Sequence, residues 1–437
     1  MAGFNPQTFY DSSFQYTNNG LYNGFNYPGP NDSDWEILLA VDLAANGIGD
    51  WFTLDDPVKG LLDNATYLLA GEVLVDITRW VRNLSVSRGR SRRIGTFTAG
   101  SCSFVLDNRD RIFDPLMVGS PFYGSIVPRK EVRVFYKKQT VFIGNVQDWD
   151  YSYDPGGRSS ALVKAVDDLT RLARTSVVAS GTATPELSGA RVNAVLDMDS
   201  VQWPEDRRLV DVGDSFLCSD VFEGQNALEY LQLVEVSEQG QLFVGKGGDL
   251  VFRSRNSATP RTGDVLVFAD DGSGVPYSQV QVNYGTELMV NRVTVAAPSS
   301  TAVAENVSSQ TTYGVISQEL TVLCASAPLV QNIADFVVAR FGQPEYRFET
   351  LLIDVDGLAA GQVADVLALE IGDVVQVKFT PNSVGAPIDR FAQIIGVSHE
   401  VGPMSHQVSL RLSSLEFAFF VLDDVVFGIL DTNHLGF

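Results

Sequence analysis

The sequence predicts a mainly β protein with α+β insertions, in which two β-barrel or sandwich domains are separated by a small α+β domain. Two long regions alternate apolar and polar residues as half-buried strands do, and the region between them spaces its apolar residues as helices do. With 437 residues, of which 45% are apolar and 19% charged, the chain is long enough to form several substantial cores.

The first β domain is predicted over residues 73–175. In "CSFVLDN" the residues Cys102, Phe104 and Leu106 point to one face, as in a strand with one buried side. The stretch "EVRVFYKKQTVFIGNVQDWDYSY" predicts two or three strands with a turn at 137–140, and "SSALVKAVDDLTRLAR" predicts a strand that runs into a short helix. These elements favour a mostly antiparallel barrel or sandwich.

The α+β domain is predicted over residues 176–272. Val192, Val195 and Leu196 in "TPELSGARVNAVLDM" have helical spacing, and "NALEYLQLVEVSEQG" predicts a second helix with Asn226 as its N-cap. The stretch "QLFVGKGGDLVFRSR" then predicts a hairpin with a Gly-Gly-Asp turn.

The second β domain is predicted over residues 273–415. Strands are expected in "YSQVQVNYG", "NRVTVAA" and "YGVISQELTVL", with a Ser/Thr/Ala-rich link at 298–312. A helix follows, with Ser326 as its cap and Gly342 at its end. Further strands are predicted in "FETLLIDVDG", "GDVVQVKF", "AQIIGVSHEV" and "QVSLRLSSL".

The two ends of the chain are predicted to dock. Residues 1–72 form an aromatic and Asn-rich arm with a docking segment, and eight aromatic residues in the first 33 suggest contact with a neighbouring subunit, or else self-folding. "LDDPVKGLLD" in the arm matches "LDDVVFGILD" in the C-terminal tail, 416–437, at seven of ten positions. The repeat is either a docking peptide used twice or two caps on the protein's own β domains. Its main residues are Leu54, Asp55, Asp56, Leu422, Asp423 and Asp424.

An arginine cluster stands out in a chain of net charge −22. No acid lies between its first and last residues. Its members are Arg79, Arg82, Arg88, Arg90, Arg92 and Arg93. Contact with a phosphate backbone is one interpretation, but no stacking aromatic residues interleave the later arginines. Because the planar guanidinium favours carboxylates and acids are abundant, the better hypothesis is pairing with acids, within the chain or across a subunit interface.

The turn after the next strand, "DNRDRIFD", supplies three acids, Asp107, Asp110 and Asp114. A calcium loop is not supported, because Arg109 and Arg111 take ligand places and the twelfth residue is Val118 rather than Glu. We therefore expect a turn held by charge pairs that serves as an interface or pins a loop.

No catalytic, cofactor or metal site is predicted. Cys102, Cys218 and Cys324 are unclustered and are expected to be free thiols in a reducing compartment. The chain has three histidines, and His399 and His406 fall in a predicted hairpin where a structural or surface role is expected. Adjacent acids such as 55–56, 167–168 and 423–424 leave a glycosidase open, but no catalytic motif accompanies them. The expectation is that the protein is not an enzyme.

No signal peptide opens the sequence, and no apolar run reaches the roughly 18 residues of a membrane span. We expect a soluble protein that is not secreted by the general route and does not insert stably in a membrane.

Several motifs together resemble the minor tail proteins of long-tailed bacteriophages, especially those that infect actinobacteria. They are spread over 73–437, and none has an enzymatic rationale: the Arg-Gly-Arg segment before a strand, "LDNRD" followed by "FDP", "SGARVNAVLDM", "VQWPEDRRLVDVG", "NRVTVAA" and "LDDVVFGILDTNHLGF".

The resemblance implies a hub of the tail tip, or baseplate, which is made in the host cytoplasm and forms a ring below the tail tube at the distal end of the virion. It implies a homotrimer whose doubled β domains imitate six-fold symmetry, without cofactors. The implied partners are the distal tail, tape measure and tip or fibre proteins, with genome DNA only passing through the lumen. The alternatives are a six-copy distal tail ring or adaptor, and a carbohydrate-binding or cell-wall-degrading protein of the host surface.

Overall fold

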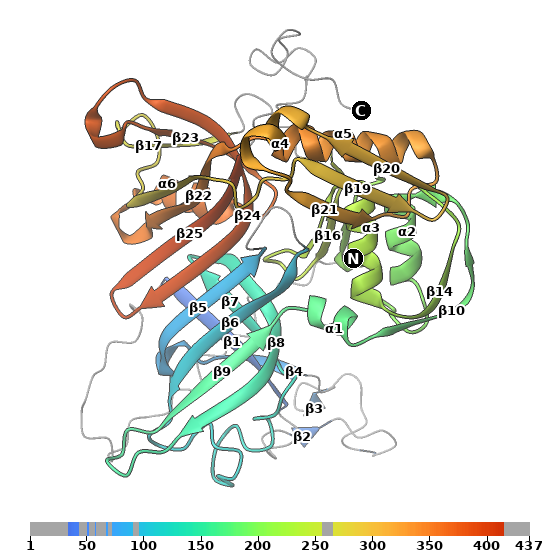
Figure 1. Cartoon of the computed structure of the whole chain (residues 1–437). Helices are drawn as coiled ribbons and strands as arrows, with labels where there is room; N and C mark the ends of the chain where they lie inside the picture. The colour runs from blue at the N-terminus through green and yellow to red at the C-terminus, as the bar shows by residue number, and fades with distance from the viewer. Residues whose placement is uncertain are drawn as a thin grey trace, which may run out of the picture.

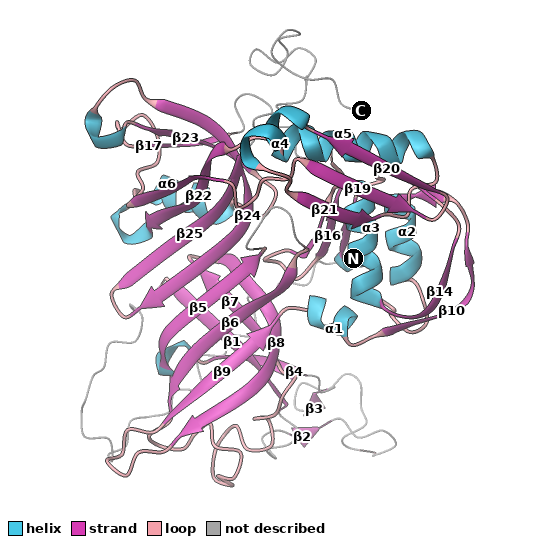
Figure 2. Ribbon diagram, viewed as in Figure 1, coloured by secondary structure: helices cyan, strands magenta, loops and turns pink. Residues whose placement is uncertain are grey.

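The structure is a computed structural model that describes residues 34–42, 50–51, 57, 67–68, 72–90, 96–255 and 265–414. Its main feature is a 13-stranded sheet built from two halves (Figures 1 and 2). The predicted fold class is confirmed, because most described elements are strands and most α-helices lie in smaller units beside the large sheet. The arm residues 1–33 and Arg92 and Arg93 lie outside the described residues, as do the main residues of the docking repeat, Leu54, Asp55, Asp56, Leu422, Asp423 and Asp424.

The first half of the sheet is antiparallel and has the order β5-β6-β9-β8-β7-β1-β4. Residues alternate between the core and the other face, as in β7, so each strand buries one apolar side. The predicted turn at 137–140 connects β7 to β8, where Lys137 and Lys138 take positive φ angles. The strands are β1 (Trp35–Asp42), β4 (Glu72–Asp76), β5 (Val81–Gly89), β6 (Thr98–Asp107), β7 (Glu131–Tyr136), β8 (Gln139–Ser152) and β9 (Ser160–Val166).

The second half continues the same sheet in the order β18-β22-β25-β24, and β24 also pairs with β23, which pairs in parallel with β17. Helix α6 (Ala360–Ala368) lies in the connection between β22 and β23. The strands are β17 (Leu266–Ala269), β18 (Gln279–Gly285), β22 (Glu345–Asp354), β23 (Val374–Phe379), β24 (Ile388–Gly402) and β25 (Ser405–Ser414).

Strand β24 joins the two halves. Its first part pairs with β23, and its second part, from Gly396 to Val401, pairs with β5. One continuous apolar core follows this pairing, with members such as Val86, Phe104, Val397 and Leu410. The two halves therefore share a backbone ladder and a core.

The α+β unit has its own core, which includes Trp203, Tyr230 and Phe252. Asn226 caps α3 by accepting hydrogen bonds from the N–H groups of Leu228 and Glu229, as predicted. The predicted helix at Val192 and the Gly-Gly-Asp hairpin are also confirmed. The elements are α1 (Leu169–Ala173), β10 (Ser176–Ala183), β11 (Glu186–Leu187), α2 (Ser188–Leu196), β12 (Arg208–Val210), β13 (Phe216–Leu217), β14 (Asp220–Asn226), α3 (Ala227–Glu238), β15 (Gln241–Val244) and β16 (Leu250–Arg253).

A third unit packs α5 (Ala327–Phe341) on a three-stranded sheet of order β20-β19-β21. The prediction of a link at 298–312 is wrong. The segment forms β20 (Ser300–Glu305), whose Ala302 and Ala304 are buried, and α4 (Val307–Tyr313), which Asn306 caps. The other strands are β19 (Arg292–Ala297) and β21 (Ser317–Thr321).

The remaining elements are short: β2 (Asp50–Trp51), β3 (Tyr67–Leu68), η3 (Thr78–Trp80), η4 (Glu205–Arg207), η5 (Val355–Gly357) and η6 (Pro381–Ser383). Two strands also extend the sheets across the predicted domain limits. Strand β1, within 1–72, pairs with β7 and β4, and β17, within 176–272, pairs with β23.

The β5–β24 pairing requires glycine at position 89. A Cβ on Gly89, where φ is +103°, would lie 2.4 Å from the carbonyl oxygen of Ile395 on β24. We expect Gly89→Ala to lower the free energy of unfolding by about 2–4 kcal/mol, because it adds backbone strain and a clash with main chain. Urea denaturation followed by circular dichroism measures this change.

Gly361→Ala is the matched control, since Gly361 lies in α6 and a Cβ there meets no atom within 4 Å. We expect unchanged or slightly higher stability. Equal stability of the Gly89→Ala and Gly361→Ala variants would contradict the importance of the close strand approach.

Candidate functional site

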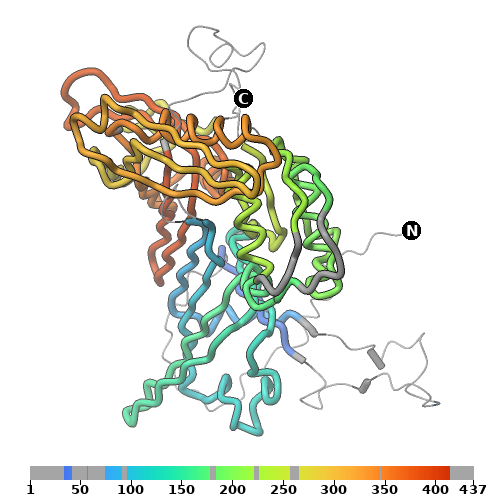
Figure 3. Tube along the Cα trace, turned by 45° about the vertical axis from the view of Figure 1, so that its right-hand side comes forward, coloured from blue at the N-terminus to red at the C-terminus, as the bar shows by residue number. Residues whose placement is uncertain are grey.

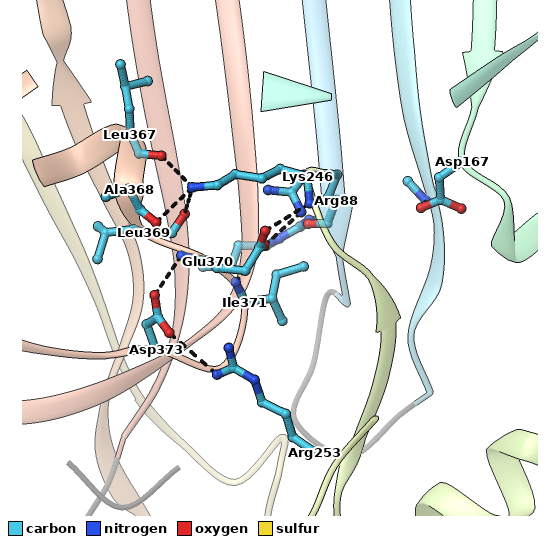
Figure 4. A network of polar contacts seen from close by, with 12 residues as sticks. Arg88, Asp167, Lys246, Arg253, Leu367, Ala368, Leu369, Glu370, Ile371 and Asp373 are labelled. Atoms are coloured by element: carbon cyan, nitrogen blue, oxygen red, sulfur yellow. Dashed lines mark hydrogen bonds and ion pairs between the residues drawn. The ribbon is translucent and has the colours of Figure 1, made fainter. Parts of the chain in front are cut away.

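A charged junction forms where the two sheet halves meet the α+β unit. Arg88 of β5 is 3% exposed, and its Nη1 lies 2.7 Å from Oε1 of Glu370, which follows α6 (Figure 4). Glu370 also accepts hydrogen bonds from the backbone N–H groups of Lys246 and Ile371, at 2.9 Å and 2.8 Å. Burial alone would raise the pKa of Glu370, but Arg88 and these N–H groups bring it below its usual value.

Lys246, in the turn between β15 and β16, satisfies the end of α6. Its Nζ donates to the carbonyl oxygens of Leu367, Ala368 and Leu369 at 2.7, 2.8 and 3.3 Å (Figure 4). Carbonyls at a helix C-terminus lack partners within the helix and favour a cation. Burial lowers the pKa of Lys246. The turn of the α+β unit is thereby attached to the second sheet half.

Two further buried acids lie at the same junction. Glu235 of α3 pairs with Arg90 at 3.8 Å, and the Arg90 guanidinium stacks 4.6 Å from the Phe97 ring centroid. Burial raises the pKa of Glu235 to about 8, although Arg90 opposes the shift. Asp167 accepts hydrogen bonds from the N–H groups of Gly100 and Leu169, and burial raises its pKa to about 7. These groups connect the first sheet half with the helices of the α+β unit.

A cavity of about 530 Å³ opens beside this junction. Its walls come from the start of β8, from β12 and from the β15–β16 hairpin, with Leu209, Asp211, Lys246 and Arg253 among the lining residues. Arg253 pairs with Asp373 at 3.4 Å (Figure 4). The polar side chains in this wall therefore also hold elements together.

The predicted arginine cluster lies in several different places. Arg79 stacks on the ring of Trp80 at 3.8 Å, and Arg82 pairs with Asp107 at 3.1 Å. Arg88 and Arg90 make the buried contacts described above. The contacts described for these four arginines are made within the chain, and Arg88 and Arg90 are too buried to meet a neighbouring molecule.

The acidic turn is held by its own charges. Asp107 pairs with Arg109 at 2.7 Å, and Asp114 pairs with Arg111 at 2.7 Å and accepts a hydrogen bond from the hydroxyl of Tyr153. Burial opposes ionisation, but these donors lower the pKa of both aspartates. Asp110 is exposed. Within the described ranges, no group of three His, Cys, Asp or Glu side chains could hold a metal ion.

The remaining candidates are buried or partly buried. Cys102 and Cys324 are buried, Cys218 is partly buried, and all three are free thiols. His399 and His406 lie in the β24–β25 hairpin and are also buried. No described helix is long and apolar enough to cross a membrane.

The sequence did not indicate Glu370, Lys246 or Glu235, and it offered Asp167 only as one of two adjacent acids. The arginines indicated that carboxylate partners exist, but Arg88 and Glu370 are 282 residues apart in the chain. Nothing local in the sequence distinguishes Glu370 from the other acids. The junction therefore becomes visible only when the sheet halves are assembled.

No protein-family model matches the sequence, and no curated protein sequence matches it. Solved structures do match. A tail protein from Neisseria meningitidis MC58 has a TM-score of 0.55 and 14% identity, with 78% of this chain and 94% of that chain covered.

The 43 kDa tail protein of prophage MuSo2 from Shewanella oneidensis also has a TM-score of 0.55 and 14% identity, with 87% of this chain and 96% of that chain covered. This chain has the fold of phage tail proteins. The match extends over nearly the whole length of both neighbours.

We expect Glu370→Gln to lower the free energy of unfolding of this tail-like protein by about 3–5 kcal/mol, because it leaves the buried Arg88 charge without its carboxylate. The loss should be largest near neutral pH. Since the pKa of Glu370 is lowered in the folded state, its stabilisation is fully present above the unfolded value of about 4.3 and is lost progressively as the pH falls from there through the lower folded-state pKa. Chemical denaturation at a series of pH values from neutral pH into the acid range below the unfolded pKa measures both effects.

The matched control is Asp150→Asn, which removes an acid from the exposed Lys164–Asp150 pair. We expect no measurable change, because exposed ion pairs contribute little. If both substitutions had the same effect, the junction would not be a special contributor to stability.

Proposed function

We propose that the protein is a structural component of a bacteriophage tail tip, most specifically the baseplate or tail hub that forms a ring below the tail tube. In this role it organises the attachment of other tip proteins during assembly and host entry, and it lies at the distal end of the tail. The observation that carries the proposal is the tail-protein fold, with two sheet halves joined edge to edge in one chain.

The joined halves support a ring with few copies. Each chain contributes two β units of comparable size, so three chains would present six such units around one axis. In the turned view the α+β unit, in green, lies to the right of the first sheet half, and the third unit, which contains α5, lies at the top of the molecule (Figure 3). We favour a homotrimer of this kind in the tail of a phage with an actinobacterial host, in contact with distal tail, tape measure and tip or fibre proteins.

We further propose that the protein acts without catalysis. The charged groups at the junction, the buried Arg88 and Asp167 and the partly buried Glu370 and Lys246, hold backbone and side chains of different units together. Genome DNA would pass through the lumen of the ring without being held, since the chain has a net charge of −22. The junction contacts fix the units relative to one another, as a scaffold requires.

The copy number and place of the protein test the proposal. Cryo-electron microscopy of tails that carry a labelled copy is expected to show three copies at the distal end. Six copies would instead indicate a distal tail ring or adaptor, and digestion of peptidoglycan by the purified protein would contradict the scaffold.

A loop on the first sheet half provides a candidate contact with other tail proteins. The connection between β6 and β7 is a series of turns. Its Phe113 ring packs edge-on against Trp80 and stacks on Phe122, with the centroids of the two phenylalanine rings 5.1 Å apart. This packed loop holds Leu116 and Val118 outward, 80% and 74% exposed. A fixed apolar tip is typical of a protein contact rather than of a free surface.

We expect the double substitution Leu116→Ser and Val118→Ser to leave stability within about 0.5 kcal/mol, because both side chains are exposed. Incorporation into tails should fall at least about tenfold, since the contact loses apolar area. Quantitative immunoblotting of purified particles measures incorporation, and Val384→Ser, also at a 74% exposed valine, is the control. Normal incorporation of the double variant would exclude this loop as a contact.

A further inference from the structure

Two of the three histidines of the chain lie side by side in the interior. His399 of β24 and His406 of β25 are both buried, and Nδ1 of His399 lies 3.1 Å from Nε2 of His406. At this distance one ring nitrogen donates a hydrogen bond and the other accepts it, which requires at least one ring to be neutral. The pair therefore depends on its protonation state.

The pair lies where the β24–β25 hairpin of the second sheet half meets the outer strands of the first half. His406 contacts the Trp35 ring of β1 and the Tyr136 ring of β7 edge-on, with centroids 4.8 Å and 4.7 Å away. Trp35 and Tyr136 also contact each other, at 4.6 Å. His406 is thus the polar member of an otherwise aromatic contact between the hairpin and strand β1.

Three cations disfavour a positive charge on the pair. The charges of Arg88 of β5 and Lys246 of the β15–β16 turn lower the pKa of His399, and the charge of Lys137 of the β7–β8 turn lowers the pKa of His406. Two acids face the contact. Asp34, before β1, pairs with Lys137 at 3.5 Å, and Asp356 of η5 accepts the backbone N–H of His406 at 2.8 Å.

A proton added to either ring would be buried among aromatic rings and near positive charges. Burial lowers the pKa of His406 to about 3, with Lys137 adding to the effect. Burial, His406 and the cations Arg88 and Lys246 lower the pKa of His399 well below its usual value. Both rings are therefore neutral in the closed structure at neutral pH and at mildly acidic pH.

We propose that the His399–His406 pair is an acid-sensitive latch, which holds strand β1 against the β24–β25 hairpin when neutral and releases the two on protonation. The sign follows from linkage. Histidines in an opened state bind protons below a pH of about 6.5, whereas the closed state excludes them, so closure weakens as the pH falls. The device acts above the pH range in which ordinary carboxylates are protonated.

Hydrogen exchange measured by mass spectrometry on the full chain tests the latch. Between pH 7 and pH 5 the opening equilibrium should rise about 25-fold for each histidine and about 600-fold for both. After correction for the intrinsic exchange rate, this increase should appear in peptides from β1 and the β24–β25 hairpin and be absent from β19. An equal change in β19, or none in β1, would overturn the proposal.

A matched pair of variants assigns the effect to these rings. The double substitution His399→Gln and His406→Gln should abolish the pH-dependent increase in β1, because glutamine does not titrate. His434→Gln, which changes the third histidine, should leave the increase intact. If the double variant opens between pH 7 and pH 5 as the unmodified protein does, the latch is refuted.

A second measurement on the unmodified protein covers the case in which the double variant fails to fold. Slow deuterium exchange at the ring C2 position reports the titration of each histidine separately by mass spectrometry. We expect His399 and His406 to remain unprotonated at pH 5 while the protein is closed. Titration of both near pH 6.5 without opening of β1 would contradict the proposal.

Discussion

The pairing of β5 with β24 is the constraint on which the rest of the structure depends. Without it the protein would be two separate sheets, each with an unpaired edge and its own smaller core. With it, one hydrogen-bonded ladder and one apolar core extend through both halves. The pairing also places Arg88 of β5 beside Glu370, because the strand that carries the arginine is fixed against β24. The positions of the junction residues thus follow from a single strand contact.

Buried charges at the junction serve to define the arrangement more than to maximise stability. An ion pair in the interior gains little over apolar packing, because both ions lose their hydration, but a misplaced partner leaves an unpaired charge at high cost. Glu370 accepts from Arg88, from Lys246 and from its own chain neighbour at once. Only one relative placement of β5, the β15–β16 turn and the end of α6 satisfies all three. We infer that the junction selects this placement against alternatives.

The sequence predicted local elements well, because their causes are local. Asn226 at a helix start, glycines in the β15–β16 turn and alternating residues in β7 act within a few positions. The segment 298–312 was misjudged since its small residues, Ala302 and Ala304, look like a linker but pack under α5.

Contacts between distant segments could not be predicted. With 53 acids in the chain, composition does not identify Glu370 as the partner of Arg88. The place of β1 in the first sheet half was not predicted for the same reason. Its partners are β7 and β4, and no local signal in the sequence connects β1 with them. For the candidate site, the sequence predicted only that the arginines pair with carboxylates. It did not predict which carboxylates these are or where in the fold they lie.

The shared strand β24 has a consequence for synthesis on the ribosome. Ser87 of β5 and its hydrogen-bonded partner Ser398 of β24 are 311 residues apart, which at about 5–20 residues per second corresponds to roughly 15–60 s of translation. Throughout that interval the nascent first half has an open strand edge. Its alternating serines, Ser85 and Ser87, and the positive charge of Arg82 and Arg88 make this edge a poor template for other apolar strands. The polar character of β5 thus protects the unfinished chain from premature association.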